Sequence, residues 1–256
     1  MLMVIPYPSR EAEERLKHIA TRRLGADPSL EKRVLEILEA VKREGDNALL
    51  RYTRQFDAPD MDQAGMSVED DEIRAAYDAV DSNFVEILRT AMANIEAFHR
   101  QQLHPSHFST RPDGSFTGQM VRPVAAAGLY IPGGKGGETP LISSVLMNGI
   151  PARLAGVKDL ALATPPRKDG SINPHLLVAA REVGATRIHK MGSAWAIAAL
   201  AYGTESVSKV DVIVGPGNIY VALSKKLVSG EVGIDLLAGP SEILVIADGQ
   251  ARPEYI

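Results

Sequence analysis

The sequence predicts an α/β protein in which a parallel sheet occupies the second half of the chain. From residue 124 onward, short apolar or β-branched runs alternate with helical segments, a pattern typical of a parallel sheet covered on both faces. Turns rich in glycine adjoin several of these runs. The residues before about 100 show mainly helical periodicity, so we expect a helical N-terminal region ahead of the sheet.

The composition is ordinary for a globular protein. The chain has 256 residues, enough for one large domain or two ordinary ones, with 45 % hydrophobic and 23 % charged residues. A formal net charge of −4 argues against nucleic acid or an anionic membrane surface as a partner. The absence of cysteine excludes disulfides and a thiol nucleophile.

Targeting and membrane signals are not found in the sequence. No apolar run approaches the roughly 18 residues that a membrane-spanning helix needs. The apolar start at residues 1–7 lacks the basic residues of a signal peptide and is too short. We therefore expect a cytoplasmic protein.

Two helical stretches and a hairpin are predicted in the first half. Helical periodicity runs from 10 to about 56 and again from 73 to 98. Ser67 and Asp70 have the spacing of a capping box, which predicts that a helix begins there. A Pro-Asp-Gly-Ser turn within 107–122 predicts a β-hairpin.

The second half is predicted to alternate strands with helices. Strands are expected over 124–131, 160–164, 187–190, 210–214, 232–237 and 243–247, and helices over 141–154, 174–183, 194–202 and about 218–228.

The stretch from Val210 to Ser224 is the strongest candidate for a ligand site. A β-branched strand ends at the turn Gly215-Pro216-Gly217, and Asn218 begins a helix. Glycines allow backbone N–H groups to approach a ligand, and a helix N-terminus offers donors without partners to an anionic or polar group. The alternative is a tight strand-to-helix connection that binds nothing.

Other local motifs are weak. The glycines from 133 to 137 lack the dinucleotide-binding spacing, and no acidic residue follows at the expected distance. His99, His104 and His107 are the only histidine cluster, and because no convincing carboxylate or thiolate set lies nearby, surface or capping roles are favoured over a metal site. Trp195, the only tryptophan, either packs in the core or lies near the mouth of a cleft. Because its neighbours are small, we expect it near the mouth of a cleft.

Several stretches spread over most of the chain carry a more specific signal. They are Gly45-Asp-Asn-Ala-Leu, Tyr52-Thr-Arg-Gln-Phe-Asp, Gly128-Leu-Tyr-Ile-Pro-Gly-Gly, Ser143-Ser-Val-Leu-Met-Asn-Gly-Ile-Pro-Ala, Ala198-Ala-Leu-Ala-Tyr-Gly-Thr, Val214-Gly-Pro-Gly-Asn-Ile-Tyr-Val-Ala and Gly233-Ile-Asp-Leu-Leu-Ala-Gly-Pro-Ser-Glu-Ile-Leu-Val-Ile-Ala-Asp. Together, in this order, they closely resemble the histidinol dehydrogenase family.

The resemblance implies a fold and an assembly. The family is a homodimer of two Rossmann-like domains that lack the usual glycine fingerprint, in agreement with its absence here. Carried over to this chain, an N-terminal arm and helix take residues 1–24. A first, discontinuous domain takes 25–125 together with 240–256, and a second domain on the NAD side takes 126–239.

The resemblance also implies a reaction and site residues. The family oxidises L-histidinol to L-histidine, the last step of histidine biosynthesis, through a bound histidinaldehyde, with two NAD and one zinc. Tyr130 and Asn218 match NAD-contacting positions, and Ser241 matches a substrate-contacting position. Trp195 falls where the family has a glutamine that contacts the cofactor, so Trp195 is also expected to contact NAD. The loop Lys135–Pro140 is about three residues longer than in the family.

The zinc ligands and the acid–base pair of the family match positions beyond Ile256. No catalytic or metal-binding residue is therefore expected in these 256 residues, and by themselves they are expected to be inactive. Two alternatives remain open. One is a relative that oxidises another small amino alcohol or a diol, and the other is a non-catalytic binding or assembly module.

Overall fold

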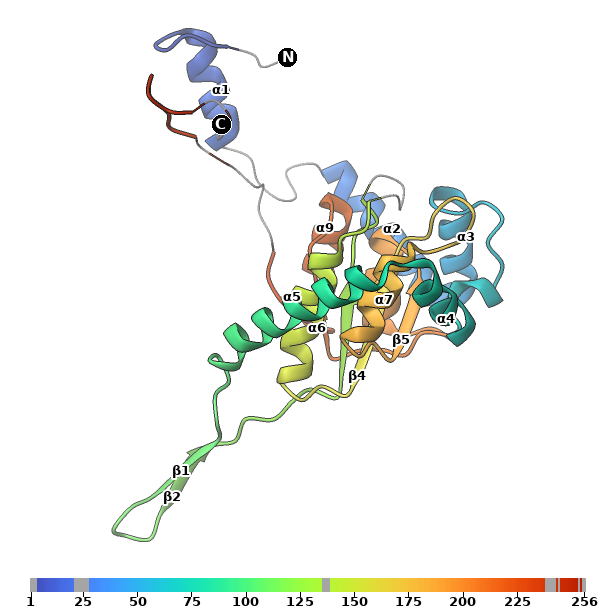
Figure 1. The fold of residues 1–256 in the computed structure, drawn as a ribbon, viewed down its shortest axis with the longest axis vertical. Coiled ribbons are helices and arrows are strands. Elements are labelled where there is room, and N and C mark those ends of the chain that lie inside the picture. Colours follow the sequence, from blue (N-terminus) through green and yellow to red (C-terminus); the bar gives the residue numbers. More distant parts are fainter. Residues whose placement is uncertain are drawn as a thin grey trace.

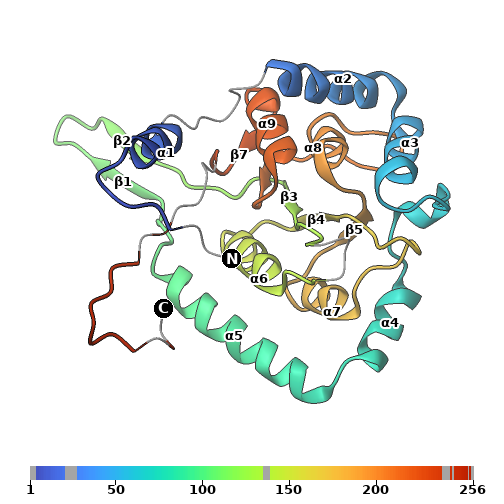
Figure 2. The same cartoon turned by 90° about the horizontal axis from the view of Figure 1, so that it is seen from above.

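The computed structural model describes residues 4–20, 28–134, 139–237, 243, 245–252 and 254. It confirms the α/β class: in the described chain a five-stranded sheet lies between layers of helices (Figures 1 and 2). The strands of this sheet are β3 (Ala126–Tyr130), β4 (Asp159–Thr164), β5 (Arg187–Lys190), β6 (Val212–Val214) and β7 (Gly233–Ile234).

All neighbouring strands in the sheet are parallel, in the order β5-β4-β3-β6-β7. The chain therefore moves outward from β3 through β4 to β5, returns across the sheet to β6, and continues to β7 on the other side. In doubly wound sheets, the point where the direction reverses leaves a crevice at the carboxyl ends of the strands, and ligands bind there. Here that point lies between β3 and β6.

Helices cover both faces of the sheet and continue the alternation that the sequence predicts. One face is covered by α6 (Ile142–Leu154) and α7 (Pro174–Glu182), and the other by α8 (Ser193–Tyr202) and α9 (Ile219–Val228). The side chains of β3 alternate between the two cores. Tyr130 joins the core that contains α8, whereas Leu129 joins the core that contains α6.

An outer layer of N-terminal helices packs on these four. The layer consists of α2 (Pro28–Glu44), α3 (Asp46–Phe56), α4 (Asp70–Ala79) and α5 (Ser82–Arg100). Figure 2 shows α2 and α3 outside α8 and α9, and α4 and α5 outside α7 and α6. This cover explains why α8, which is apolar on all sides, is buried along almost its whole length. The short η1 (Ala64–Met66) precedes α4.

Two elements project from this body. The predicted hairpin is confirmed as β1 (His107–Thr110) and β2 (Phe116–Gln119), which pair antiparallel and extend away from the sheet with every residue exposed (Figure 1). The helix α1 (Arg10–Ala20) lies apart from the body at the opposite end of the view. No helix in the described part of the chain is both long and apolar enough to cross a membrane.

Two local predictions are wrong. The capping box at the start of α4 is formed by Glu69 and Glu72, because the helix begins at Asp70 and Glu69 is therefore the residue at its N-cap. Ser67 also has an extended backbone, but it lies two residues too early in the chain to cap this helix. The described residues of the expected strand at 243–247 are not in a strand, and Ile243 and Ile246 are exposed, because they pair with no neighbouring strand of the described chain. The described chain contains one parallel sheet, so the division into two Rossmann-like domains stays a prediction.

Candidate functional site

The glycine turn after β6 is pressed against the end of β3. Gly215 has a φ of 120°, and a Cβ at this position would lie 2.1 Å from the carbonyl oxygen of Tyr130. Only glycine adopts this backbone and this approach without strain. The turn thereby brings the start of α9 to the carboxyl end of the central strand.

Asn218 caps α9, as the sequence predicts. Its side-chain oxygen accepts hydrogen bonds from the backbone N–H groups of Tyr220, at 3.0 Å, and Val221, at 3.2 Å. These contacts satisfy two of the donors that a helix leaves without partners at its N-terminus. Because the oxygen serves the cap, the side-chain amide nitrogen is the group available as a donor to a ligand.

A cavity of about 320 Å³ lies beside this turn at the carboxyl ends of β3 and β4. Tyr130 and Asn218, which the family resemblance matches with NAD contacts, both line it although they belong to different segments. The complete lining is Phe56, Asp57, Tyr130, Pro132, Gly133, Gly134, Pro165, Pro166, Lys168, Ser193 and Asn218. The position between β3 and β6 is the one at which doubly wound sheets bind ligands.

Tyr130 is buried at the floor of the site. Its hydroxyl oxygen accepts a hydrogen bond from the backbone N–H of Ser193 at 3.1 Å, and Ser193 has a φ of 45°, a conformation uncommon for a residue with a side chain. Burial raises the pKa of Tyr130 to about 12. The phenol is therefore neutral near pH 7 and keeps a proton that it can donate to a ligand.

Asp57 is a residue of this cavity that the sequence did not single out. It ends α3 and lines the cavity together with Tyr130. Burial raises the pKa of Asp57 to about 7, and the nearby charge of Lys168 acts in the opposite direction. The available signal was the motif Tyr52-Thr-Arg-Gln-Phe-Asp, which ends on this carboxylate, but its burial depends on packing that the motif does not reveal.

Trp195 does not lie at the mouth of the cavity, so that expectation is wrong. The indole is 4 % exposed and stacks on Tyr52 and Phe56, with ring centroids 5.8 and 5.5 Å away. The first turn of α8 faces α3, which directs this side chain into the interface between the two helices. Since Phe56 lines the cavity, Trp195 lies behind the cavity wall, and its predicted contact with a cofactor stays a prediction.

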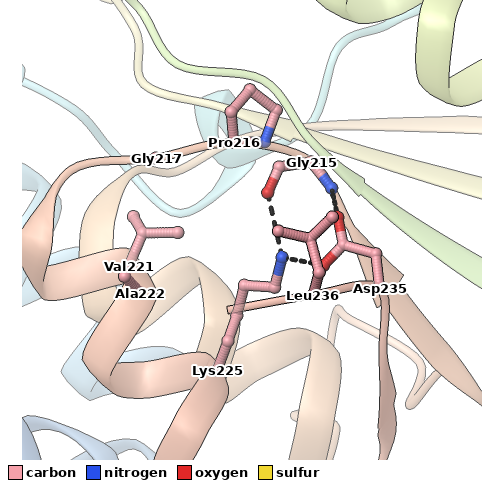
Figure 3. Close-up of a pocket in the computed structure, with 8 residues that line it drawn as sticks. All are labelled: Gly215, Pro216, Gly217, Val221, Ala222, Lys225, Asp235 and Leu236. Carbon is pink, nitrogen blue, oxygen red and sulfur yellow. Dashed lines mark hydrogen bonds and ion pairs between the residues drawn. The ribbon is translucent and has the colours of Figure 1, made fainter. Parts of the chain in front are cut away.

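A second cavity, of about 210 Å³, adjoins the same glycine turn (Figure 3). The ammonium group of Lys225 donates to the carbonyl oxygen of Gly215 at 3.0 Å and forms an ion pair with Asp235. The other oxygen of Asp235 accepts a hydrogen bond from the N–H of Gly215 at 2.8 Å. These two side chains, which we call the Lys225–Asp235 clamp, hold both backbone polar groups of Gly215.

The remaining candidates do not form a metal site in the described chain. Ser241 and most of the loop Lys135–Pro140 lie outside the described residues. Among the described residues, no group of three or more His, Asp or Glu side chains is placed to hold a metal ion, and His104 and His107 are exposed. Burial is the main reason that the pKa of His189 is lowered to about 4, so this side chain is neutral near pH 7.

Comparison with known proteins decides the family. The family model described as "Histidinol dehydrogenase" matches residues 20–256. The chain belongs to the histidinol dehydrogenase family. It is 53 % identical to the histidinol dehydrogenase of Desulfotalea psychrophila over 97 % of this chain and 57 % of that protein, and 55 % identical to that of Moorella thermoacetica over 91 % and 54 %.

A solved structure supports the same conclusion. The chain is similar to the crystal structure of histidinol dehydrogenase from Elizabethkingia anophelis, with a TM-score of 0.82 and 41 % identity, over 94 % of this chain and 55 % of that one. The chain thus spans little more than half the length of these family members.

Proposed function

We propose that this chain provides the NAD-binding part of an enzyme that oxidises L-histidinol to L-histidine through a bound histidinaldehyde, the last step of histidine biosynthesis. The observation that carries the proposal is the meeting of Tyr130 and Asn218 in one cavity at the switch point of the sheet. These are the two positions that the family resemblance matches with NAD contacts. Membership of the family supports an oxidoreductase of histidine biosynthesis.

The cavity fits a dinucleotide chemically. Ser193 and Asn218 place the N-termini of α8 and α9 at its edge, where the helix dipoles favour a pyrophosphate. Gly133 and Gly134 keep the opposite side free of bulky side chains. The NAD supplies a hydride acceptor, while Tyr130 and Asn218 bind and orient it as hydrogen-bond donors.

Zinc does not fit the described residues, because they bring together no group of three or more His, Asp or Glu side chains that could hold it. The resemblance places its ligands and the acid–base pair beyond Ile256, so our proposal for residues 1–256 by themselves is cofactor binding without turnover. Homodimerisation and a cytoplasmic location stay predictions from the resemblance and the composition.

The test separates cofactor binding by Asn218 from its role in capping. Asn218→Ser keeps a side-chain oxygen for the cap but lacks the amide donor. We expect calorimetric titration to show NAD binding to the wild type and an affinity about fivefold lower in Asn218→Ser, the effect of one hydrogen bond of about 1 kcal/mol. Asn83→Ser, at an exposed position in the first turn of α5, is the control and should bind as the wild type does.

Unchanged affinity for NAD in Asn218→Ser would show that the side-chain amide of Asn218 does not bind NAD. A wild-type chain that binds no NAD would contradict the proposed function and favour the alternative of an assembly module.

A further inference from the structure

The carboxylate of Asp57 reaches the cavity from outside the sheet. Asp57 belongs to the outer helical layer, yet it lines the same cavity as Tyr130 and Asn218. Its Oδ2 atom is buried beneath the start of α8, 3.1 Å from the point that a Cβ on Gly192 would occupy. A side chain at position 192 would therefore crowd this carboxylate, and glycine leaves room for it.

The carboxylate lacks hydrogen-bond donors. Within the described part of the chain, Oδ2 of Asp57 is a buried oxygen with no partner. The ammonium group of Lys168 donates to the carbonyl oxygen of Phe56 at 3.3 Å and makes no ion pair with Asp57 among the described residues. Leaving a buried carboxylate without donors costs free energy, and such groups in native structures often mark a ligand site.

Two more buried polar atoms without partners belong to the same helix interface. In the described chain these are Oγ1 of Thr53, one turn before Asp57 on α3, and Nε1 of Trp195 in the first turn of α8. Unsatisfied polar atoms thus collect where α3 meets the start of α8. Of these three residues only Asp57 lines the cavity, so it is the one whose side chain can reach a ligand there.

Asp57 lies close to the end of β4, where this sheet lacks the acidic residue that other NAD-binding sheets have. In doubly wound sheets that bind NAD, an acidic residue at the end of the second strand hydrogen-bonds the ribose hydroxyls. The second strand here is β4, which ends at Thr164 and is followed by Pro165 and Pro166, neither of them acidic. A Cβ on Gly192 would lie 2.8 Å from the Cβ of Pro165, so Asp57 and Pro165 lie against the same glycine.

We propose that Asp57 accepts hydrogen bonds from the adenosine ribose hydroxyls of NAD and excludes the 2′-phosphate of NADP. This inference rests on the NAD-binding function proposed above. A carboxylate is an acceptor for two hydroxyl groups, but it repels a phosphate and offers it no donor. Lys168, which lines the same cavity, is the cation that would face a 2′-phosphate if the charge of Asp57 were removed.

The test compares NAD and NADP on three proteins by calorimetric titration at about pH 8. At this pH the carboxylate of Asp57, with its pKa of about 7, is mostly charged. We expect the wild type to bind NAD at least about tenfold more tightly than NADP, as hydrogen bonds to a charged group predict. Asp57→Asn should lose about tenfold in affinity for NAD and lose none for NADP. Asp60→Asn, three residues further on at an exposed position, is the matched control and should behave as the wild type does.

Each outcome separates the two proposals. Asp57→Asn with wild-type affinity for both dinucleotides would overturn the role of Asp57 and leave the NAD-binding function standing. If Asp57→Asn does not fold, the wild type alone decides, since equal affinity for NAD and NADP would overturn the inference. A loss of both affinities in equal proportion would indicate a structural role and also overturn it, whereas a wild type that binds neither dinucleotide would overturn the proposed function itself.

Discussion

Asp57 shows how a single side chain acquires its properties from its surroundings. In the unfolded chain its carboxyl has an ordinary pKa of 3.8, whereas in the folded protein burial raises this pKa to about 7. Between these two values the folded state holds a proton that the unfolded state releases. The contribution of Asp57 to the free energy of unfolding is therefore least unfavourable at low pH and worsens as the pH rises toward 7.

The variant Asp57→Asn isolates this effect. We expect its free energy of unfolding, relative to the wild type, to increase steadily as the pH is raised from about 4 to about 7, and to level off above that range. His189, with its pKa lowered to about 4, changes stability in the opposite direction but does so equally in both proteins. Urea titrations at several pH values measure the difference, and a difference independent of pH would contradict the raised pKa.

The burial of Asp57 could not be predicted from the sequence, because it depends on contacts between distant segments. The helix cap at Asn218 was predicted from the sequence because its signals are local: a strand, a glycine turn and the cap residue lie within a few residues of one another. Asp57 was missed because its burial arises when α3 packs on the start of α8, far away in the sequence. Trp195 was placed wrongly for the same reason, since its stacking partners are on α3.

Among the elements of the site, the connection from β6 to α9 is held by hydrogen bonds to both backbone polar groups of its first glycine, Gly215. The Lys225–Asp235 clamp holds the N–H and the carbonyl oxygen of Gly215, and Gly215 lies against the carbonyl of Tyr130. The clamp therefore fixes where Asn218 and Tyr130 stand relative to one another.

Substitutions of two adjacent lysines test whether the Lys225–Asp235 clamp stabilises the protein. The side chain of Lys225 is 4 % exposed, whereas that of Lys226 is 43 % exposed and pairs with Glu31 at 3.5 Å. We expect Lys225→Met to lower the free energy of unfolding by about 3 kcal/mol, because it leaves Asp235 without its cation. Lys226→Met should change it by less than about 1 kcal/mol. Urea unfolding measures both, and equal effects would show that the clamp does not stabilise the turn.

Most elements were predictable because their signals are local. The helices covering the sheet and the hairpin at 107–122 follow from periodicity and turn residues, and the structure confirms them. The strand predicted at 243–247 fails in its described residues because an apolar run becomes a strand only beside a partner. The order of strands was not predictable from any one run, since it depends on which helices fit each face.

In the described chain as a whole, the sheet lies between two double layers of helices (Figure 2). The candidate site lies at the carboxyl ends of β3 and β4. The helices of the first half pack directly on the sheet region, since α2 and α3 pack on α8 and α9, and α4 and α5 pack on α7 and α6. The site is shared between these layers: Asp57 comes from the outer layer, and Tyr130 and Asn218 come from the sheet region.

For the polypeptide as a whole, we predict that residues 1–256 bind NAD without oxidising L-histidinol. The described chain brings no metal-binding group together, and the resemblance assigns zinc and proton transfer to positions beyond Ile256. Metal analysis after incubation with zinc should find no stoichiometric ion, and NADH absorbance should not increase. Sustained turnover by this polypeptide would contradict the site map and direct attention to its own histidines, His99, His104, His107, His175 and His189.

In our proposal the cavity lined by Tyr130 and Asn218 holds NAD, and a crystal structure of the chain with NAD bound tests this claim. We expect the dinucleotide between these two side chains, with its pyrophosphate at the N-termini of α8 and α9. NAD bound elsewhere, for example in the cavity at the Lys225–Asp235 clamp with Tyr130 and Asn218 both out of contact, would contradict the claim.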